Sequence, residues 1–221
     1  MPRLIIFANG VIPEFASARR LIQAEDVLTA ADGGTRLALA LGLYPSVVIG
    51  DLDSLSPDDR QQLDAQGTEI QQYPREKDET DLELAFQYAC RGGYREILVV
   101  GAVGGRLDQT VGNLSLLAKP EFAALDVRID DGVEEALITR SRCEIHGEPG
   151  DIVSLLPWGG PVSGICTEGL RWPLRDERLF PDRTRGISNE MMHKTADISQ
   201  KSGLLLVIHR RQPAGNNGNA L

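Results

Sequence analysis

The chain has 221 residues and a formal net charge of −9 at pH 7. A protein that coats the nucleic-acid backbone needs a basic face, so this charge argues against nucleic-acid binding. No segment approaches the roughly 18 apolar residues of a membrane helix, and the N-terminus does not resemble a signal peptide. Three cysteines without CxxC spacing indicate reduced, mostly buried thiols, which are typical of a soluble cytoplasmic protein.

Strand patterns and helix patterns alternate from the N-terminus to about residue 130. This alternation is typical of a parallel sheet with crossover helices. Ser56-Pro57 has the sequence of a helix start, and Thr80 stands three residues before Glu83 in the spacing of a capping box. The expected strands are 3–8, 27–31, 47–49, 68–73, 96–100 and 125–130, and the expected helices are 13–24, 35–41, 57–66, 84–91 and 109–118.

The pattern changes after residue 131. Short apolar runs are separated by glycine, proline and charged residues, as in a small all-β domain. Residues 181–201 are polar and weakly periodic, so we expect a long loop there. The fold class is therefore α/β, with a Rossmann-like parallel-sheet domain at 1–131, an all-β sandwich domain at 132–212 and a frayed tail at 213–221.

The strand at 47–49 is followed by Gly50 and then by Asp51 and Asp53, which flank one leucine. Two alternating carboxylates at the tip of a buried strand can direct oxygens to one point. Oxygen ligands of this kind suit Mg²⁺, with phosphate as a further ligand. Asp and Ser are also ordinary turn residues, so this turn indicates a metal site only if other strands end in the same way.

Acidic or glycine-rich turns follow three other strands of the predicted sheet. Because parallel strands end at the same edge, their turns meet in one crevice where ligands bind. Carboxylates gathered there repel one another unless cations offset their charge, and Mg²⁺ with a polyphosphate would do so. The residues concerned are Asp32 and Gly33 after the second strand, Lys77, Asp78 and Asp81 after the fourth, and 101–108 after the fifth.

The turn at 101–105 follows a strand and precedes a helix, so its free backbone N–H groups suit phosphate. Gly104 and Gly105 would cradle the phosphate, and the Arg106 guanidinium would bind it through two hydrogen bonds. Asp108 is equally suited to capping the helix and to acting in the site. Asn113, one turn into that helix, is either a further polar contact to the nucleotide or a solvated residue. Lys77 would place a positive charge on the same polyphosphate.

Six motifs follow one another in a fixed order between residues 31 and 189, and a closing strand follows at 204–208. They are Ala31-Asp32-Gly33-Gly34, Gly50-Asp51-Leu52-Asp53-Ser54, Lys77-Asp78-Glu79-Thr80-Asp81-Leu82-Glu83, Gly101-Ala102-Val103-Gly104-Gly105-Arg106-Leu107-Asp108, Gly169-Leu170-Arg171-Trp172-Pro173-Leu174 and Gly186-Ile187-Ser188-Asn189.

This ordered set resembles the thiamine pyrophosphokinase family. The resemblance implies transfer of a pyrophosphoryl group from ATP to the hydroxyl of thiamine, giving thiamine diphosphate and AMP, in a homodimer that binds thiamine near the subunit interface. It implies that Asp51, Asp53 and Asp81 hold Mg²⁺, with Asp32 and Asp78 close by. It assigns the ATP phosphates to Lys77, Gly104, Gly105 and Arg106, and thiamine to Trp172, Ser188 and Asn189.

Gln109 departs from the family pattern, in which histidine often follows the aspartate of this turn. A carboxylate is then the better candidate for accepting the hydroxyl proton, and both Asp81 and Asp108 remain open for that role. Two other functions also remain open. One is a pyrophosphokinase acting on another heterocyclic alcohol, and the other is a sensor of nucleotide or thiamine without catalysis.

Overall fold

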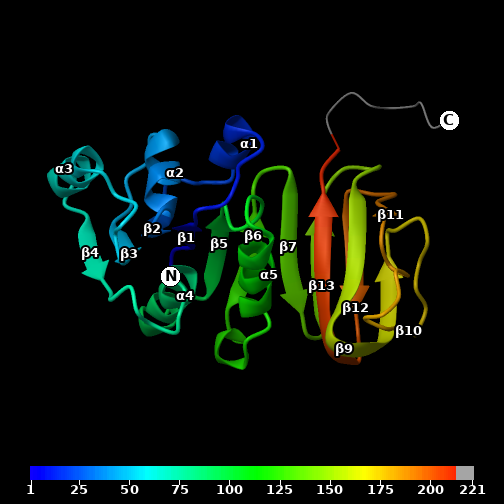
Figure 1. Cartoon of the computed structure of the whole chain (residues 1–221). Helices are drawn as coiled ribbons and strands as arrows, with labels where there is room; N and C mark the ends of the chain where they lie inside the picture. Colours follow the sequence, from blue (N-terminus) through cyan, green and yellow to red (C-terminus); the bar gives the residue numbers. More distant parts are fainter. Residues whose placement is uncertain (213–221) are drawn as a thin grey trace. The chain divides into compact units, whose positions relative to one another are not determined.

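A computed structural model describes residues 1–212 of the chain, and the predicted tail at 213–221 lies outside the described residues. The chain divides into two units, Met1–Gly132 and a second that begins at Val133. Figure 1 shows helices and strands alternating in the first unit and only strands labelled in the second. None of the helices described is long and apolar enough to cross a membrane.

The first unit is built on a parallel sheet with the strand order β4-β3-β2-β1-β5-β6. β1 lies in the interior of this sheet and is buried on both faces, as the apolar sequence of the strand predicts. The strands are β1 Leu4–Phe7, β2 Val27–Ala31, β3 Val47–Gly50, β4 Glu69–Gln72, β5 Glu96–Val100 and β6 Asp126–Asp130.

The helices of the first unit begin where their sequence signals indicate. Ser56 accepts a hydrogen bond from the N–H of Asp59 and completes a capping box, and Thr80 accepts one from the N–H of Glu83. Three helices differ from prediction by two residues or more, because α1 is shorter than 13–24, α4 begins at Asp81 and not at 84, and α5 begins at Leu107 and not at 109. The helices are α1 Phe15–Arg20, α2 Gly34–Ala40, α3 Pro57–Ala65, α4 Asp81–Arg91, α5 Leu107–Leu116 and the 3₁₀ helix η1 Pro120–Phe122.

The core of the first unit follows from the alternation of side chains along the strands. Ile5 and Phe7 of β1 pack in one cluster with Ala38 of α2 and Leu63 of α3. The alternate residues of β1 point to the opposite face of the sheet and are also fully buried. Helices on both faces leave the turns at the strand ends as the place where polar groups can gather.

The second unit is all-β across the residues described. Its strands pair antiparallel in the order β7-β13-β9-β12-β8, and β10 and β11 pair with β9. The long strand β9 pairs with β13 through its first half and with β12 at its end. The strands are β7 Glu134–Thr139, β8 Arg142–His146, β9 Ile152–Glu168, β10 Glu177–Leu179, β11 Asn189–Glu190, β12 Thr195–Ser199 and β13 Ser202–Arg210.

The structure corrects two predictions. The expected loop at 181–201 contains β11 and β12, because Ala196 and Ile198 alternate inward and are fully buried. Two apolar residues among polar neighbours give too weak an alternation to be recognised in the sequence. The cysteines are free as expected but not mostly buried, since Cys90 and Cys166 are exposed and Cys143 is partly buried.

A charged cluster is buried in the second unit around His209, whose side chain is fully buried. Its Nδ1 lies 3.1 Å from Oε1 of Glu135, and its Nε2 lies 2.9 Å from Oδ2 of Asp151. Burial alone lowers the pKa of His209, but the hydrogen bonds to the two carboxylates outweigh burial and raise it. The His209 side chain thus joins β13 to β7 and to Asp151, the residue directly before β9.

The His209 cluster should make the stability of the second unit depend on pH. Because the pKa of His209 is raised, its charge stabilises the fold fully below the ordinary value of 6.5 and progressively less as pH rises through the folded-state pKa. His209→Gln should lower the free energy of unfolding by roughly 3 kcal/mol at pH 6, and the loss should shrink toward pH 9. Urea unfolding followed by tryptophan fluorescence measures this unit, since Trp158 and Trp172 both lie in it.

His146→Gln provides the matched control, because His146 is a largely exposed histidine of the same unit that pairs with Glu144. That change should cost less than about 1 kcal/mol at any pH. A difference between His209→Gln and the unsubstituted protein that stays constant from pH 6 to pH 9 would contradict the assigned charge.

Candidate functional site

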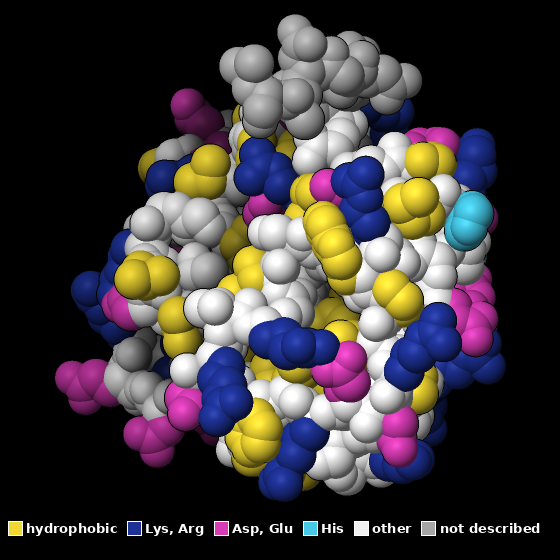
Figure 2. All heavy atoms as spheres, turned by 90° about the vertical axis from the view of Figure 1, so that its right-hand side faces the viewer, with side chains coloured by type: hydrophobic (Ala, Val, Ile, Leu, Met, Phe, Trp, Pro, Cys, Tyr) yellow, Lys and Arg dark blue, Asp and Glu magenta, His cyan; other side chains and the backbone are white. Residues whose placement is uncertain are grey.

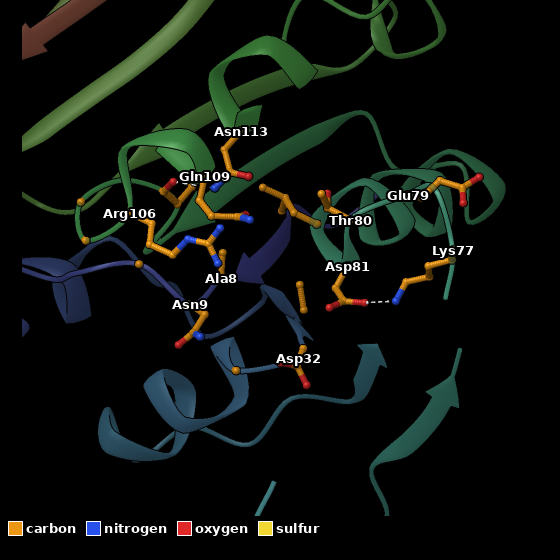
Figure 3. Close-up of a pocket in the computed structure, with 17 residues that line it drawn as sticks. Ala8, Asn9, Asp32, Lys77, Glu79, Thr80, Asp81, Arg106, Gln109 and Asn113 are labelled. Atoms are coloured by element: carbon orange, nitrogen blue, oxygen red, sulfur yellow. Dashed lines mark hydrogen bonds and ion pairs between the residues drawn. The ribbon is translucent and has the colours of Figure 1, made fainter. Parts of the chain in front are cut away.

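A cavity of about 480 Å³ lies in the first unit at the carboxyl ends of the parallel strands. The loops after β1, β2 and β5 form its wall together with the first residues of α4 and α5. Figure 3 shows Arg106 and Gln109 on the α5 side, Asp81 and Lys77 on the α4 side, and Asn9 and Asp32 from the loops after β1 and β2. The edge of the sheet that the sequence predicted as a binding site is therefore hollow.

The turn after β3 presents two carboxylates because the leucine between them is anchored in the core. Leu52 is buried and packs in the core cluster of the first unit, with its backbone in the left-handed region at φ 66°. Asp51 Oδ1 accepts a hydrogen bond of 3.1 Å from the N–H of Asp53. A left-handed non-glycine residue is costly, and such strain is found mostly where a site requires it.

Asp32 brings a third carboxylate to this turn. It follows β2 in a left-handed conformation with φ 39°, its N–H donates to the carbonyl of Ile49 at 2.8 Å, and its Oδ1 accepts from Ser54 Oγ at 3.0 Å. Asp32, Asp51 and Asp53 each offer an oxygen within 4.8 Å of the others. Three hard oxygen ligands this close repel one another, and their chemistry fits Mg²⁺.

Asp81 lies beside this cluster and is paired with a cation. Lys77 Nζ lies 3.1 Å from Asp81 Oδ1, and both side chains are largely buried. Burial raises the pKa of Asp81 more than the hydrogen bond and charge of Lys77 lower it, and the charges of Asp32 and Asp51 raise it further. A Cβ on Gly50 would lie 2.9 Å from Cβ of Asp32 and 3.2 Å from Cγ of Asp81, so glycine is what lets the two carboxylates approach.

The glycine-rich turn before α5 is hydrogen-bonded to the loop after β1. The N–H of Val11 donates to the carbonyl of Val103 at 2.9 Å. Gly104 and Gly105 have φ values of 81° and 71°, which side chains rarely adopt, and both line the cavity. Their free N–H groups and the amino end of α5 favour an anion at this point.

Arg106 lines the cavity but is also held by Asp108. Its Nε donates to Oδ1 of Asp108 at 3.1 Å and its Nη2 donates to Oδ2 at 2.5 Å. The hydrogen bonds from Arg106 lower the pKa of Asp108, and both side chains are largely exposed. An exposed pair of this kind contributes little stability, so a phosphate could take over the guanidinium at small cost.

The predicted residues of the first unit do not all lie at the cavity. Asp32, Gly33, Lys77, Asp81, Gly104, Gly105, Arg106 and Asn113 line it, and the Asn113 amide also donates to the carbonyl of Ala102 at 2.7 Å. Asp51 and Asp53 adjoin it through Asp32. Asp78 and Asp108 are exposed and are not part of the lining.

Asn9 and Gly10 belong to the site although no motif in the sequence marks them. Both line the cavity, and Asn9 lies so close to Gly33 that a Cβ there would come within 2.5 Å of its side chain. They follow β1, which lies between β2 and β5 in the sheet. The signal available was the fully apolar sequence of β1, which indicates an interior strand whose end turn adjoins the others.

A second cavity of about 340 Å³ lies in the second unit. Its lining includes Leu155, Trp172, Leu174, Arg185, Ile187 and Asn189. Figure 2, turned toward the side where β10 and β11 lie in Figure 1, shows exposed hydrophobic side chains among charged ones of both signs. Trp172 is 56% exposed and faces a guanidinium, since Cζ of Arg171 lies 5.6 Å from its ring centroid.

Two of the three residues predicted to bind thiamine line this second cavity. Trp172 and Asn189 line it, but Ser188 does not. Ser188 is exposed, has a left-handed backbone with φ 61°, and donates its N–H to Ser154 Oγ at 3.0 Å.

Comparison with known families decides what the two sites belong to. Residues 18–129 match the family model described as thiamin pyrophosphokinase, catalytic domain, and residues 142–205 match the model described as thiamin pyrophosphokinase, vitamin B1 binding domain. The chain belongs to the thiamine pyrophosphokinase family. Most of the cavity lining in the first unit lies within the first match, and the whole lining of the second cavity lies within the second.

Individual thiamine pyrophosphokinases agree with this assignment. The enzyme from Bacillus subtilis is 28% identical over 80% of this chain and 84% of its own length. Thiamine pyrophosphokinase 1 of Oryza sativa subsp. japonica is 31% identical over 76% of this chain and 67% of its own length. The crystal structure of the Bacillus subtilis protein has a TM-score of 0.85 at 25% identity and covers 96% of this chain and 100% of that chain.

The carboxylate cluster should bind Mg²⁺ and should be destabilising without it. Asp51→Asn removes one charge from the group of three, so the variant should melt at the same or a higher temperature in chelator. Mg²⁺ at ten times its Kd should stabilise the unsubstituted protein by about 1.4 kcal/mol, which raises its Tm by on the order of 3 °C, and this gain should disappear in the variant. Thermal unfolding with and without Mg²⁺ measures both effects.

Asp64→Asn is the matched control, because Asp64 is an exposed carboxylate on α3 outside the cluster. It should keep the full response to Mg²⁺. If Asp51→Asn keeps that response as well, Asp51 is not a ligand.

Proposed function

We propose that the chain transfers the pyrophosphoryl group of ATP to the hydroxyl of thiamine, giving thiamine diphosphate and AMP. The observation that carries the proposal is that the catalytic and vitamin B1 binding models both match this chain, in order. The chain is a thiamine diphosphokinase. In this proposal the parallel-sheet unit is a Rossmann-like domain for ATP and Mg²⁺, and the all-β unit is a sandwich that binds thiamine.

The ATP phosphates would bind at the amino end of α5. The N–H groups of Gly104 and Gly105 and the helix dipole favour anionic oxygens there. Arg106 would exchange Asp108 for phosphate, and Lys77 would supply a second cation from the opposite wall of the cavity. Positioning and neutralisation of charge of this kind provide most of the catalysis in phosphoryl transfer.

Asp51, Asp53 and Asp81 would hold Mg²⁺, with Asp32 adjoining. When bound, Mg²⁺ neutralises charge on the transferred group. Asp81 is the better proton acceptor for the thiamine hydroxyl, because burial raises its pKa, whereas Arg106 lowers the pKa of Asp108. A loose transition state needs little help from a base, which is compatible with Gln109 standing after Asp108.

Thiamine would bind against Trp172 in the second cavity. A cationic thiazolium or a flat aminopyrimidine suits an aromatic face, and this one is exposed. The family resemblance assigns polar contacts with the pyrimidine to Ser188 and Asn189, and on Asn189 a single N–H of Nδ2 remains for such a contact. A homodimer with thiamine near the subunit interface, and a cytoplasmic location that suits three free cysteines, complete the proposal.

The reaction itself is tested by incubating the protein with ATP, Mg²⁺ and thiamine and quantifying AMP and thiamine diphosphate together. The proposal expects the two products in equal amounts, because one pyrophosphoryl transfer yields one of each. AMP formed with inorganic pyrophosphate in place of thiamine diphosphate would show that water accepts the group in this mixture, and would favour another heterocyclic alcohol as the natural acceptor. Binding of thiamine without nucleotide turnover would favour a sensor, and either result would overturn the proposed reaction.

Trp172→Ala should change the KM for thiamine and leave the KM for ATP nearly unchanged. Loss of the aromatic face should raise the KM for thiamine about tenfold, which corresponds to roughly 1.4 kcal/mol, and should leave the KM for ATP within about twofold. Steady-state kinetics with each substrate varied in turn measures both. Trp172→Phe keeps an aromatic face and should recover most of the affinity, and a defect confined to ATP would refute the role of Trp172.

A further inference from the structure

The buried side-chain amide of Asn189 is bonded almost entirely to the backbone. Its Oδ1 accepts from the N–H of Trp172 at 3.0 Å and from the N–H of Glu190 at 2.9 Å, and its Nδ2 donates to the carbonyl of Trp172 at 2.7 Å. We infer that Asn189 is a positioning residue, which fixes Trp172 and acts on thiamine through it. The inference rests on the proposed function for its substrate.

The side-chain amide of Asn189 continues a short antiparallel pairing in place of a backbone group. The segment before Trp172 runs antiparallel to the segment after Asn189, with a bridge between Leu170 and Met191 and a hydrogen bond of 2.9 Å from the N–H of Arg171 to the carbonyl of Glu190. This register sets Trp172 opposite Asn189. The backbone of Asn189 already pairs with β9, so its side chain supplies the acceptor and donor that Trp172 needs.

Little hydrogen-bonding capacity remains on Asn189 for a ligand. An amide oxygen has two lone pairs, and the N–H groups of Trp172 and Glu190 take both. One of the two N–H groups on Nδ2 binds the carbonyl of Trp172, which leaves a single donor. Asn189 is also only 7% exposed, whereas the Trp172 side chain that it anchors stands free at the cavity.

Clamping both backbone groups of Trp172 fixes the direction in which its indole leaves the chain. An aromatic side chain has only two further torsions, so a fixed backbone largely preorganises the ring. A preorganised surface binds more tightly because less freedom is lost on binding. The cation of Arg171, itself paired with Glu190, supports the ring within the same pairing.

Asn189→Leu and Asn189→Asp test the inference by kinetics. Leucine removes both functions of the amide, and aspartate keeps an acceptor but loses the donor to the carbonyl of Trp172. Both should raise the KM for thiamine, the former about tenfold, with the KM for ATP within about twofold. In a Trp172→Ala background, Asn189→Leu should add less than about twofold, because the residue through which it acts is gone. Effects that multiply in full would overturn the inference in favour of direct contact.

A substrate-free measurement separates this inference from the proposed function. In Trp158→Phe protein, Trp172 is the sole tryptophan, and its fluorescence anisotropy should fall in both Asn189 variants. Unchanged anisotropy would overturn the positioning role even in an active enzyme. A fall in anisotropy would support it even if thiamine were not turned over, a result that would refute only the proposed function.

Gln200→Leu controls for the general loss of a buried amide. Gln200 is 7% exposed in the same unit, and its Nε2 donates to the carbonyl of Thr139 at 2.7 Å, away from the second cavity. Its replacement should lower stability without changing the KM for thiamine or the anisotropy of Trp172. A matching change in both would attribute the Asn189 effects to lost stability and would overturn the inference.

Discussion

Repulsion between carboxylates is the constraint around which the first unit is built. Asp32, Asp51 and Asp53 hold carboxylate oxygens within 4.8 Å of one another, and Nη2 of the exposed Arg75 lies 3.9 Å from Oδ2 of Asp53. Such crowding opposes folding, so other parts of the fold must impose it. The burial of Leu52 and the absence of a side chain at Gly50 do so, because one fixes the turn and the other admits Asp32 and Asp81.

The elements that could be predicted are those whose signals are local. The strands at 27–31 and 96–100 are found as predicted, because each is an apolar run bounded by turn residues. The caps at Ser56 and Thr80 were likewise visible in the sequence. β12 was missed because burying Ala196 and Ile198 requires β8 and β9 on either side, and that pairing joins residues far apart in the sequence.

The same distinction holds within the site. Asp51 and Asp53 form one turn, so their spacing alone predicted a shared ligand. The place of Asp32 beside them depends on the pairing of Ala31 with Ile49, which sets Asp32 opposite Gly50. Asn9 was missed because it reaches the site only if β1 lies between β2 and β5. No single motif predicts that strand order. The shared edge of the sheet was thus predictable from the sequence, whereas the side chains that adjoin each other along it depend on strand order.

The two cavities differ in the interactions that they offer to the proposed ligands. In the first, charge and backbone N–H groups converge, and these interactions suit any polyphosphate held near a metal. In the second, the proposed binding of thiamine depends on the orientation of the Trp172 ring, which has no charge of its own. Such a face gains selectivity only if its backbone is fixed, and Asn189 provides this with a side chain whose type suggested a ligand contact. A polar residue beside a ligand can therefore shape specificity without binding the ligand itself.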